Sequence, residues 1–209
     1  HRGSCRCADN PLNEWWKLVV IQGRGERHGL DAAMREAACR VTVALDHDRG
    51  ATSAAMSDDR SESTAAEQAA PATVALAVSG GIAAYKAVMV ARLLKARRIR
   101  VLPLMTASGA RFVGAVTLSG ICGEPVLENM WDEHFAGEAH VSVADRADVV
   151  AIVPCTADLL ARLSQGRADD LVAAVALVSR GPLVVAPAMH PRMWAHPATR
   201  RNVAQLLAD

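Results

Sequence analysis

The sequence predicts an α/β fold in which a doubly wound parallel sheet has helices on both faces. From residue 73 onward, apolar runs of four or five residues alternate with segments that have the apolar spacing of helices. Each of these runs ends in glycine, proline or a polar turn. Of the 209 residues, 51% are hydrophobic but only 3% are aromatic, so the core must consist mainly of Ala, Val and Leu. Such small side chains suit helices packed closely on a parallel sheet.

The first unit of this pattern has the clearest signals. Val74–Val78 is an apolar run short enough for a strand buried on both faces, and Gly80 and Gly81 end it. A helix is predicted over Ala83–Ala96, with basic residues at its end. A strand, a glycine turn and a helix in this order present backbone N–H groups to a ligand, and a phosphate suits such a site. An ordinary turn between strand and helix is the alternative.

The later elements continue the alternation, and their boundaries are least clear between the second and third strands. Further strands are predicted at Arg100–Met105, Val149–Val153 and Leu183–Ala186, and further helices at Asp158–Gln165, Asp170–Leu177 and Pro197–Leu207. The intervening region is predicted as an apolar stretch to Val116, a loop or short helix at Leu118–Met130, a polar irregular segment at Trp131–His140 and a short helix or turn at Val141–Ala147.

Distinctive residues fall where the predicted strands end. They are Gly80–Gly81, Thr106–Ser108, Pro154–Asp158 and Pro187–Trp194. In an open parallel sheet, ligands bind beyond the carboxyl ends of the strands. Four strand ends at one edge therefore predict a ligand site there more strongly than any single motif does.

Three of these segments resemble a known family. Residues 79–86 (SGGIAAYK), 154–159 (PCTADL) and 187–194 (PAMHPRMW) are similar to the homo-oligomeric flavin-containing cysteine decarboxylases, with phosphopantothenoylcysteine decarboxylase of coenzyme A biosynthesis as the nearest type. The similarity extends over residues 73–208. It implies a flavodoxin-like, Rossmann-like doubly wound sheet. It also implies assembly as a homotrimer or a multiple of trimers, with FMN as cofactor at subunit contacts.

The resemblance implies that residues at the strand ends bind FMN. Gly80, Gly81 and Ile82 match positions along the phosphate and ribityl chain, Thr106 and Ser108 match hydroxyl donors, Thr156, Ala157, Asp158 and Leu159 match the segment around the flavin, and Ala188 matches a backbone contact to the isoalloxazine ring. These positions agree with the small side chains and free backbone donors expected from the sequence alone.

The resemblance also implies a catalytic residue and a reaction. His140 matches the family's catalytic histidine, and an imidazole exchanges protons near neutral pH; an ordinary surface histidine in a polar loop is the alternative. In the implied reaction, FMN oxidises the substrate's cysteine side chain to a thioaldehyde, carbon dioxide leaves, and reduced flavin returns the electrons. A cysteine in a C-terminal flap then donates a proton. The implied substrate is 4'-phosphopantothenoylcysteine and the product 4'-phosphopantetheine.

Several positions depart from the family pattern. His190 stands where the family has an asparagine that holds the substrate carboxylate, and it is predicted to bind substrate together with Met193. Asp169 also replaces a common asparagine, and its negative charge disfavours an anionic substrate unless Arg167 or another cation offsets it. Cys155 is predicted to be a packing residue. The sequence ends at Asp209, before the expected flap and its cysteine. If the protein ends there, the reaction is expected to stop at an enethiol or not to occur.

Three other functions remain open from the sequence. The first is a peptide-cysteine decarboxylase that forms an enethiol. The second is a relative of the flavin-modifying prenyltransferases, although their first glycine turn has a different composition. The third is a non-catalytic flavin-binding or regulatory subunit, which the replacements at His190 and Asp169 leave open.

The chain is predicted to have three parts: an N-terminal segment of unknown role (1–46), a flexible linker (47–72) and the flavoprotein domain (73–209). The linker is rich in Asp, Ser, Ala and Glu and cannot bury enough surface to offset the cost of ordering. The first part is predicted to contain a strand, a glycine-rich turn, a helix and a second strand, at Lys17–Ile21, Gly23–Gly29, Leu30–Cys39 and Arg40–Leu45. This order is only weakly similar to a dinucleotide-binding site. Cys5 and Cys7 lack a second ligand pair, so no metal is expected.

Net charge, apolar runs and cysteine content indicate which binding partners and which cellular compartment to expect. A net charge of +1 gives no reason to expect nucleic acid binding, and no apolar run is long enough to cross a membrane. The first residues, HRGS, do not form a secretory signal. Five cysteines without a framework spacing favour a reducing cytoplasm. The expected partner is therefore a small-molecule cysteinyl substrate.

Overall fold

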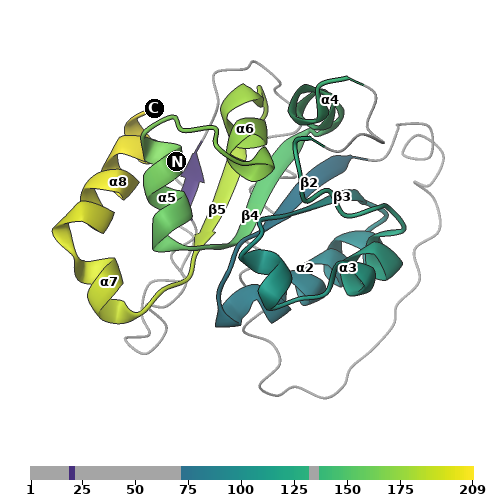
Figure 1. Ribbon diagram of the computed structural model, residues 1–209, viewed down its shortest axis with the longest axis horizontal. Helices are drawn as coiled ribbons and strands as arrows, with labels where there is room; N and C mark the ends of the chain where they lie inside the picture. The colour runs from purple at the N-terminus through teal and green to yellow at the C-terminus, as the bar shows by residue number, and fades with distance from the viewer. Residues whose placement is uncertain (1–18, 22–71, 132–136) are drawn as a thin grey trace, which may run out of the picture.

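The computed structural model describes residues 19–21, 72–131 and 137–209 of the chain. Its centre is a five-stranded sheet with the strand order β1-β5-β4-β2-β3 (Figure 1). Four strands run parallel, namely β2 (Thr73–Val78), β3 (Arg100–Met105), β4 (Val149–Cys155) and β5 (Leu183–Pro187). Because β3 is added on one side of β2 while β4 and β5 are added on the other, the winding reverses between β2 and β4. This is the predicted flavodoxin-like α/β fold.

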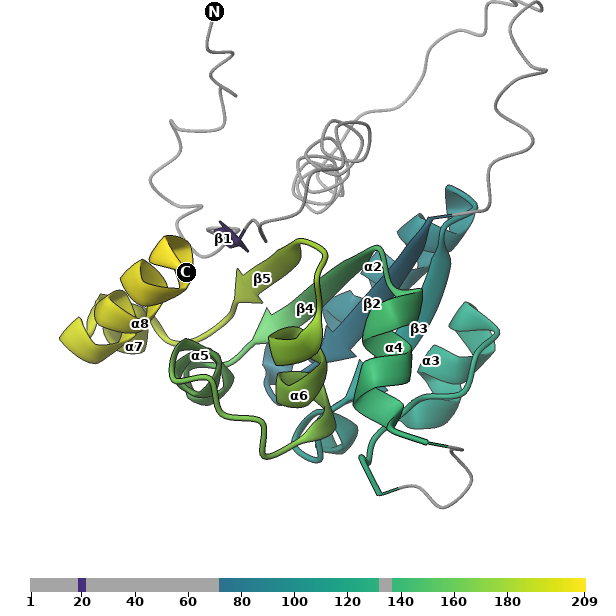
Figure 2. The same ribbon diagram turned by 90° about the horizontal axis from the view of Figure 1, so that it is seen from above.

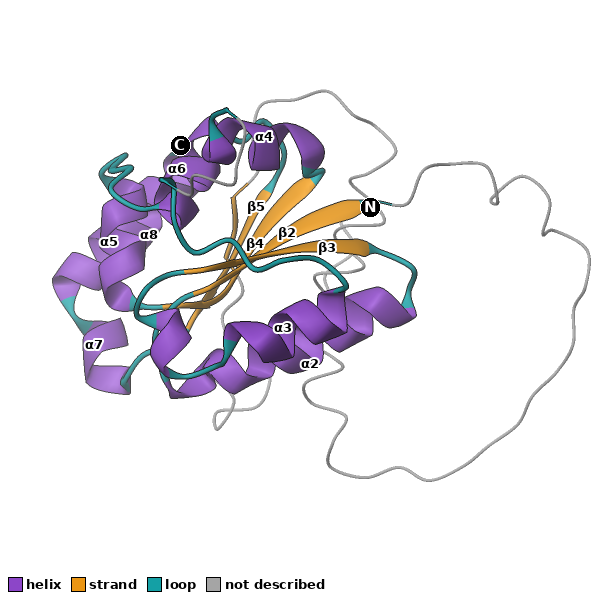
Figure 3. Cartoon of the chain, turned by 45° about the vertical axis from the view of Figure 1, so that its right-hand side comes forward, coloured by secondary structure: helices purple, strands orange, loops and turns teal. Residues whose placement is uncertain are grey.

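Helices cover both faces of the sheet (Figure 3). One face carries α2 (Tyr85–Ala96) and α3 (Ala115–Cys122). The other carries α4 (Ala139–Arg146), α5 (Ala157–Ser164), α6 (Leu171–Val178) and α8 (Pro197–Ala208). The short α7 (Pro191–Ala195) follows β5, and two 3-10 turns, η1 (Ile82–Ala84) and η2 (Gly109–Arg111), follow β2 and β3.

The central strand β2 divides the core into two layers. All six of its residues are buried. Ala75 and Ala77 belong to the layer beneath α4, α5, α6 and α8, whereas Leu76 and Val78 belong to the layer beneath α2 and α3. Successive side chains of a strand point to opposite faces, so a strand covered on both sides has no polar alternation. This explains the continuous apolar run that predicted the strand.

Several predicted boundaries were wrong. β4 continues through Pro154 to Cys155 instead of ending at Val153, because Pro154 lies where the register with β5 shifts between Ile152 and Cys155. A proline at such an irregularity removes no regular ladder bond. The first helix starts later than predicted, at Tyr85, because residues 82–84 form η1.

The region between β3 and β4 contains more helix than predicted. α3 begins within the predicted apolar stretch, after Gly114 in an extended conformation, and ends at a left-handed Gly123. α4 begins at Ala139, so His140 lies in a helix and not at the end of the polar irregular segment. Residues 191–195, which had no predicted helix, form α7 behind the Pro at its first position.

The predicted strand at Lys17–Ile21 is present in part, since Val19–Ile21 form β1. β1 pairs antiparallel with β5, with Val19 opposite Val185 and Ile21 opposite Leu183. The other N-terminal expectations, from Cys5 and Cys7 to the Arg40–Leu45 strand and the linker, lie outside the described residues, and the division into three parts stays a prediction. Among the helices described here, none is long and apolar enough to span a membrane.

Candidate functional site

The carboxyl ends of β2 and β4 lie side by side where the winding of the sheet reverses, and Ser79 joins them. Its hydroxyl donates a hydrogen bond to the carbonyl of Pro154 (2.7 Å) and accepts one from the backbone N–H of Thr156 (3.1 Å). The Ser79 N–H also donates to the Pro154 carbonyl (3.3 Å). Ser79 is only 2% exposed, so these bonds are shielded from water. The two strand ends are therefore fixed to each other at the place where doubly wound sheets bind ligands.

Glycine allows the loops after β2 and β3 to touch. A Cβ atom added to Gly80 would lie 2.5 Å from Cβ of Ser108 and 3.1 Å from its carbonyl oxygen. A Cβ atom added to Gly109 would likewise clash, in this case with the carbonyl oxygen of Val78. The wall of the site between these loops consequently consists of backbone and very small side chains.

Thr106 holds the loop after β3 in place. Its side chain is buried, and its hydroxyl oxygen accepts a hydrogen bond from the N–H of Gly109 (3.0 Å). Its own N–H donates to the carbonyl of Val78 (3.0 Å). Ser108 is exposed at the same edge. Of the two predicted hydroxyl donors, Thr106 thus already has a structural role and Ser108 faces solvent.

Thr156 begins α5 as its N-cap. Its hydroxyl oxygen accepts from the N–H of Leu159 (3.2 Å). The side chain of Leu159 is fully buried in the core, so only its backbone lies near the edge of the sheet. Ala157 is partly exposed in the first turn. The predicted flavin segment is therefore a capped helix start that offers backbone groups and one small side chain.

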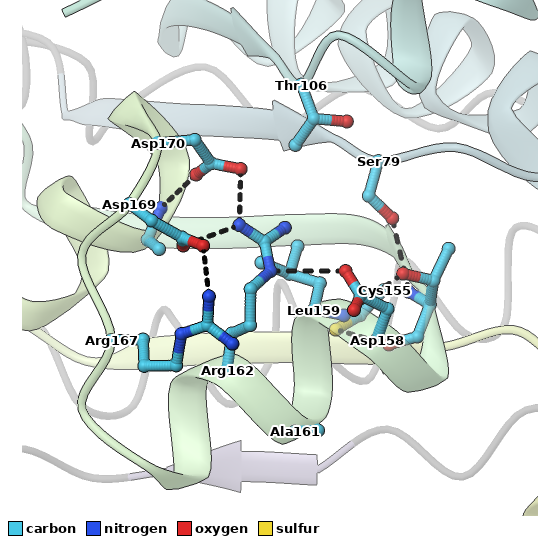
Figure 4. A network of polar contacts seen from close by, with 12 residues as sticks. Ser79, Thr106, Cys155, Asp158, Leu159, Ala161, Arg162, Arg167, Asp169 and Asp170 are labelled. Carbon is cyan, nitrogen blue, oxygen red and sulfur yellow. Dashed lines mark hydrogen bonds and ion pairs between the residues drawn. The ribbon is translucent and has the colours of Figure 1, made fainter.

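Asp158 is the charged member of that segment, and it is tied to Arg162. The Asp158 carboxylate is 80% exposed and accepts a hydrogen bond from Nε of Arg162 (3.1 Å), one turn further along α5. Arg162 is only 14% exposed, and its Nη1 also contacts Asp169 (2.9 Å) and Asp170 (2.7 Å). Figure 4 shows the guanidinium surrounded by these three carboxylates.

The contacts of Arg162 extend to the start of α6. Asp170 is the N-cap of α6 and accepts from the N–H of Ala173 (2.8 Å), and Asp169 also pairs with Arg167 (2.7 Å). Burial disfavours the charge of Arg162, but the hydrogen bonds to Asp170 and Asp169 outweigh it and raise its pKa. The hydrogen bond from Arg162 holds the pKa of Asp169 below its usual range. The charge of Asp169 is thus offset by two arginines.

The loop after β5 lies beside the carboxyl end of β4, on the side away from β2. The N–H of Ala188 donates to the carbonyl of Cys155 (2.9 Å), so the predicted backbone contact of Ala188 lies beside the end of β4. His190 is the N-cap of α7, and its Nδ1 accepts from the N–H of Arg192 (3.2 Å). Because Nδ1 acts as acceptor, the neutral ring carries its proton on Nε2. His190 and Met193 are both exposed.

His140 lies in the first turn of α4, which packs on the same face of the sheet as α5 and α6. The N–H of Asp148, just after α4, donates to the carbonyl of Thr73 (2.8 Å), which places the end of α4 at the amino end of β2. The first turn of α4, with His140, is therefore the part of this helix nearer the carboxyl ends of the strands, and Figure 2 shows the course of α4. His140 is partly buried.

The two described cysteines are free thiols inside the protein. Cys122 and Cys155 are both buried, and burial raises the pKa of each thiol. A buried thiol with a raised pKa is a poor nucleophile. This agrees with the packing role predicted for Cys155. Among residues 72–131 and 137–209, no group of His, Cys, Asp and Glu could hold a metal ion.

Four large apolar side chains in the segments that follow β2 and β3 are exposed. Ile82 is 85% exposed, and Tyr85, Phe112 and Val116 are also exposed. They come from η1, α2, the end of η2 and α3. Ile82 is itself one of the predicted cofactor residues.

The structure brings together most of the predicted residues, with Gly80 against Ser108, Thr156 on Ser79 and Ala188 beside Cys155. Sequence reasoning missed Ser79 and Arg162. Ser79 had a signal, since it is the polar residue directly after a buried strand. Arg162 had a partial signal, since it lies four residues after Asp158, a spacing that pairs charges on a helix.

Comparisons with known proteins agree with this geometry. Residues 62–209 match the model of the family described as Flavoprotein. The coenzyme A biosynthesis bifunctional protein CoaBC of Mycobacterium tuberculosis strain H37Rv is 50% identical over 138 residues, which are 65% of this chain and 32% of that protein. CoaBC of Vibrio vulnificus strain YJ016 is 38% identical over 136 residues, covering 64% and 33%. The chain thus spans about a third of the length of these relatives.

The chain is also similar to solved structures of decarboxylases. The FMN-dependent cysteine decarboxylase SpaF has a TM-score of 0.63 and 32% identity, with 66% of this chain and 80% of that chain covered. A cysteine-to-serine mutant of PPC decarboxylase complexed with pantothenoylaminoethenethiol has a TM-score of 0.58 and 26% identity, with 66% and 78% covered.

Proposed function

The chain belongs to the Flavoprotein family, and on that basis we propose that it is an FMN-dependent decarboxylase of a cysteinyl carboxylate, with 4'-phosphopantothenoylcysteine as its substrate. The observation that carries the proposal is the joining of three strand ends at one edge of the sheet, where Gly80 after β2 lies against Ser108 after β3 and Ser79 fixes the ends of β2 and β4 to each other. The similarity to CoaBC proteins at up to 50% identity favours this substrate. FMN, when bound, supplies a reversible two-electron acceptor for the substrate cysteine.

The residues present fit this cofactor. Gly80 and Gly109 let the loops after β2 and β3 pack against each other, and a Cβ at Gly81 would meet nothing within 4 Å, so backbone without side chains borders open space where a flat ring and an anionic chain can approach closely. Gly80, Gly81, Ile82, Thr106 and Ser108 are the residues after β2 and β3 that would hold FMN. On the β4 and β5 side they are Thr156, Ala157, Asp158, Leu159 and Ala188. Leu159, whose side chain is buried, and Asp158, whose carboxylate is paired with Arg162, contribute backbone only.

Two histidines are assigned to the substrate. His140 exchanges the proton with the reacting cysteinyl group, a role that its position in the first turn of α4 supports. His190 binds the substrate carboxylate through the Nε2–H that its capping bond leaves free, and the exposed Met193 lines the same side. The pairing of Asp169 with two arginines removes the objection that its charge repels an anionic substrate.

The test is carbon dioxide release from 4'-phosphopantothenoylcysteine by the purified, FMN-loaded protein. We expect His140→Asn to lower the rate by about 10²–10⁴-fold, the usual contribution of a general acid–base group, while the flavin absorbance is retained. His196→Asn is the matched control, because it makes the same replacement at an exposed histidine that caps α8, and asparagine is a favoured N-cap residue. Undiminished release by the His140→Asn protein would remove His140 from the reaction.

SpaF, an FMN-dependent cysteine decarboxylase, is 32% identical to this chain, which supports decarboxylation of a cysteinyl group. The second candidate substrate is the one that the sequence left open, a peptide cysteine that yields an enethiol. Assaying such a peptide beside 4'-phosphopantothenoylcysteine separates the two classes by which of them releases carbon dioxide.

We also propose that the protein acts in the cytoplasm as a homotrimer or a multiple of trimers. The exposed apolar side chains of Ile82, Tyr85, Phe112 and Val116 support a contact between copies beside the cofactor. Light scattering of the FMN-loaded protein tests the assembly, and a monomeric mass would exclude it.

A further inference from the structure

Arg162 occupies an unusual position for a surface helix residue. Its guanidinium contacts three carboxylates from two elements: Asp158 in the first turn of α5, and Asp169 and Asp170 at the start of α6. Only 14% of its side chain is exposed, and its partner Asp158 is 80% exposed. Figure 4 shows Arg162 between these groups, on the same side of α5 as Asp158.

The carboxylate of Asp158 has a strong alternative position. The first N–H groups of a helix lack partners within the helix, and the helix dipole attracts negative charge to them. In α5, the hydroxyl of Thr156 satisfies the N–H of Leu159 only. A released Asp158 side chain, which belongs to this first turn, could therefore turn toward its N–H groups. Its charge would then face the edge of the sheet at which Ser79 and Thr156 meet.

We propose that Arg162 is a positioning residue that holds the carboxylate of Asp158 along the side of α5 and so keeps its negative charge away from the FMN site. The inference rests on the proposed function, because an anionic cofactor is what an inward-turned carboxylate would repel. Arg162 itself acts through Asp158.

Arg167 provides a charge-matched comparison. It also pairs with Asp169, but it is 56% exposed and contacts no other carboxylate in the described part of the chain. Replacing either arginine by methionine removes one positive charge from the same cluster. Only the replacement of Arg162 releases Asp158. A difference between the two variants therefore excludes net charge as the cause. Because Arg162→Met also removes the contacts with Asp169 and Asp170, a further variant at Asp158 isolates the contribution of its carboxylate.

The experiment measures FMN affinity of the apoprotein by quenching of flavin fluorescence. We expect Arg162→Met to weaken binding about tenfold, the scale of one charge interaction near a protein surface, and Arg167→Met to change it less than about twofold. Adding Asp158→Asn to Arg162→Met should restore the affinity to within about threefold of that of Asp158→Asn alone. Added salt should reduce the defect of Arg162→Met, because it screens exposed charges.

A purely structural role gives a different result. If Arg162 only held α5 and α6 together, neutralising Asp158 would not restore binding, and that outcome overturns the inference. Equal loss in Arg162→Met and Arg167→Met also overturns it in favour of net charge. Should Arg162→Met fail to fold, Arg162→Lys, which can pair with one carboxylate at a time, is tested in the same cycle with Asp158→Asn. Wild-type protein that does not bind FMN would instead overturn the proposed function.

Discussion

Replacing Gly80 by alanine tests whether close contact between the loops after β2 and β3 builds the site. The backbone of Gly80 does not adopt a positive φ, so alanine is conformationally acceptable there. The added methyl group, however, would lie 2.5 Å from Cβ of Ser108 and 3.1 Å from the Ser108 carbonyl carbon and oxygen. Non-bonded carbon atoms are at their optimum near 3.5–4.0 Å, so the two loops must separate by about 1 Å.

The expected cost follows from this overlap. Inserting a methyl group into a close-packed region costs about 1–3 kcal/mol when the surroundings cannot yield. Ser108 is followed by Gly109, which is itself packed against the carbonyl of Val78, so the loop after β3 has little room to retreat. We therefore expect a loss of about 2 kcal/mol in the free energy of unfolding of the apoprotein. FMN binding should weaken as well, because the backbone wall is displaced.

Urea unfolding of the apoprotein measures this loss. Gly120→Ala is the matched control, since a Cβ at Gly120, within α3, meets nothing within 4 Å. That control should stabilise the protein by about 0.5–1 kcal/mol, the usual gain of alanine over glycine in a helix. Adding Ser108→Gly to Gly80→Ala removes the closest contact and should recover part of the lost stability. A Gly80→Ala protein as stable as wild type, or no recovery in the double variant, would refute the reasoning.

Two further predictions concern the polar contacts around the site. Ser79→Ala leaves the N–H of Thr156 without its partner and should lower the free energy of unfolding in urea by about 1–3 kcal/mol. The control Ser179→Ala removes a buried hydroxyl that has no partner among the described residues, so it should cost nothing. Equal effects of the two variants would contradict the role assigned to Ser79. Asp169 has a lowered pKa, so its ion pairs stabilise the fold fully above about pH 3.9, its unfolded value, and lose this effect as the pH falls through the folded pKa. The stability difference between wild type and Asp169→Asn, followed by urea unfolding, should therefore shrink below about pH 4, and a difference that does not change with pH would exclude this pairing.

The sheet could be predicted because its signals are local. Each parallel strand is a continuous apolar run, as at Val74–Val78, and each is followed by a break and a helical pattern. The pairing of β1 with β5 could not be predicted, since it joins residues 19–21 to residues 183–185 and no local pattern specifies that register. Pro154 misled the prediction of β4 because its effect depends on a register shift in the neighbouring pair of strands.

The candidate site could also be predicted where its signals are local. The strand-end rule and the motifs selected Gly80, Ser108, Thr156 and Ala188, which the structure places along one edge. The rule did not reveal that Asp158 is engaged by Arg162, because two of the three partners of Arg162 come from beyond the end of α5. Spacing along a helix predicts only the pair within that helix.

The start of α5 is held from two directions, and this explains why a short helix can serve as part of a binding site. Thr156 ties it to the end of β2 through the buried hydroxyl of Ser79. Arg162 ties its first turn to α6 through Asp158 and Asp170. Water competes little for the first link, whereas the second is partly exposed and depends on salt. The position of the helix start therefore follows mainly from Ser79, and the direction of the Asp158 charge follows from Arg162, so geometry and electrostatics at this edge are set by different residues.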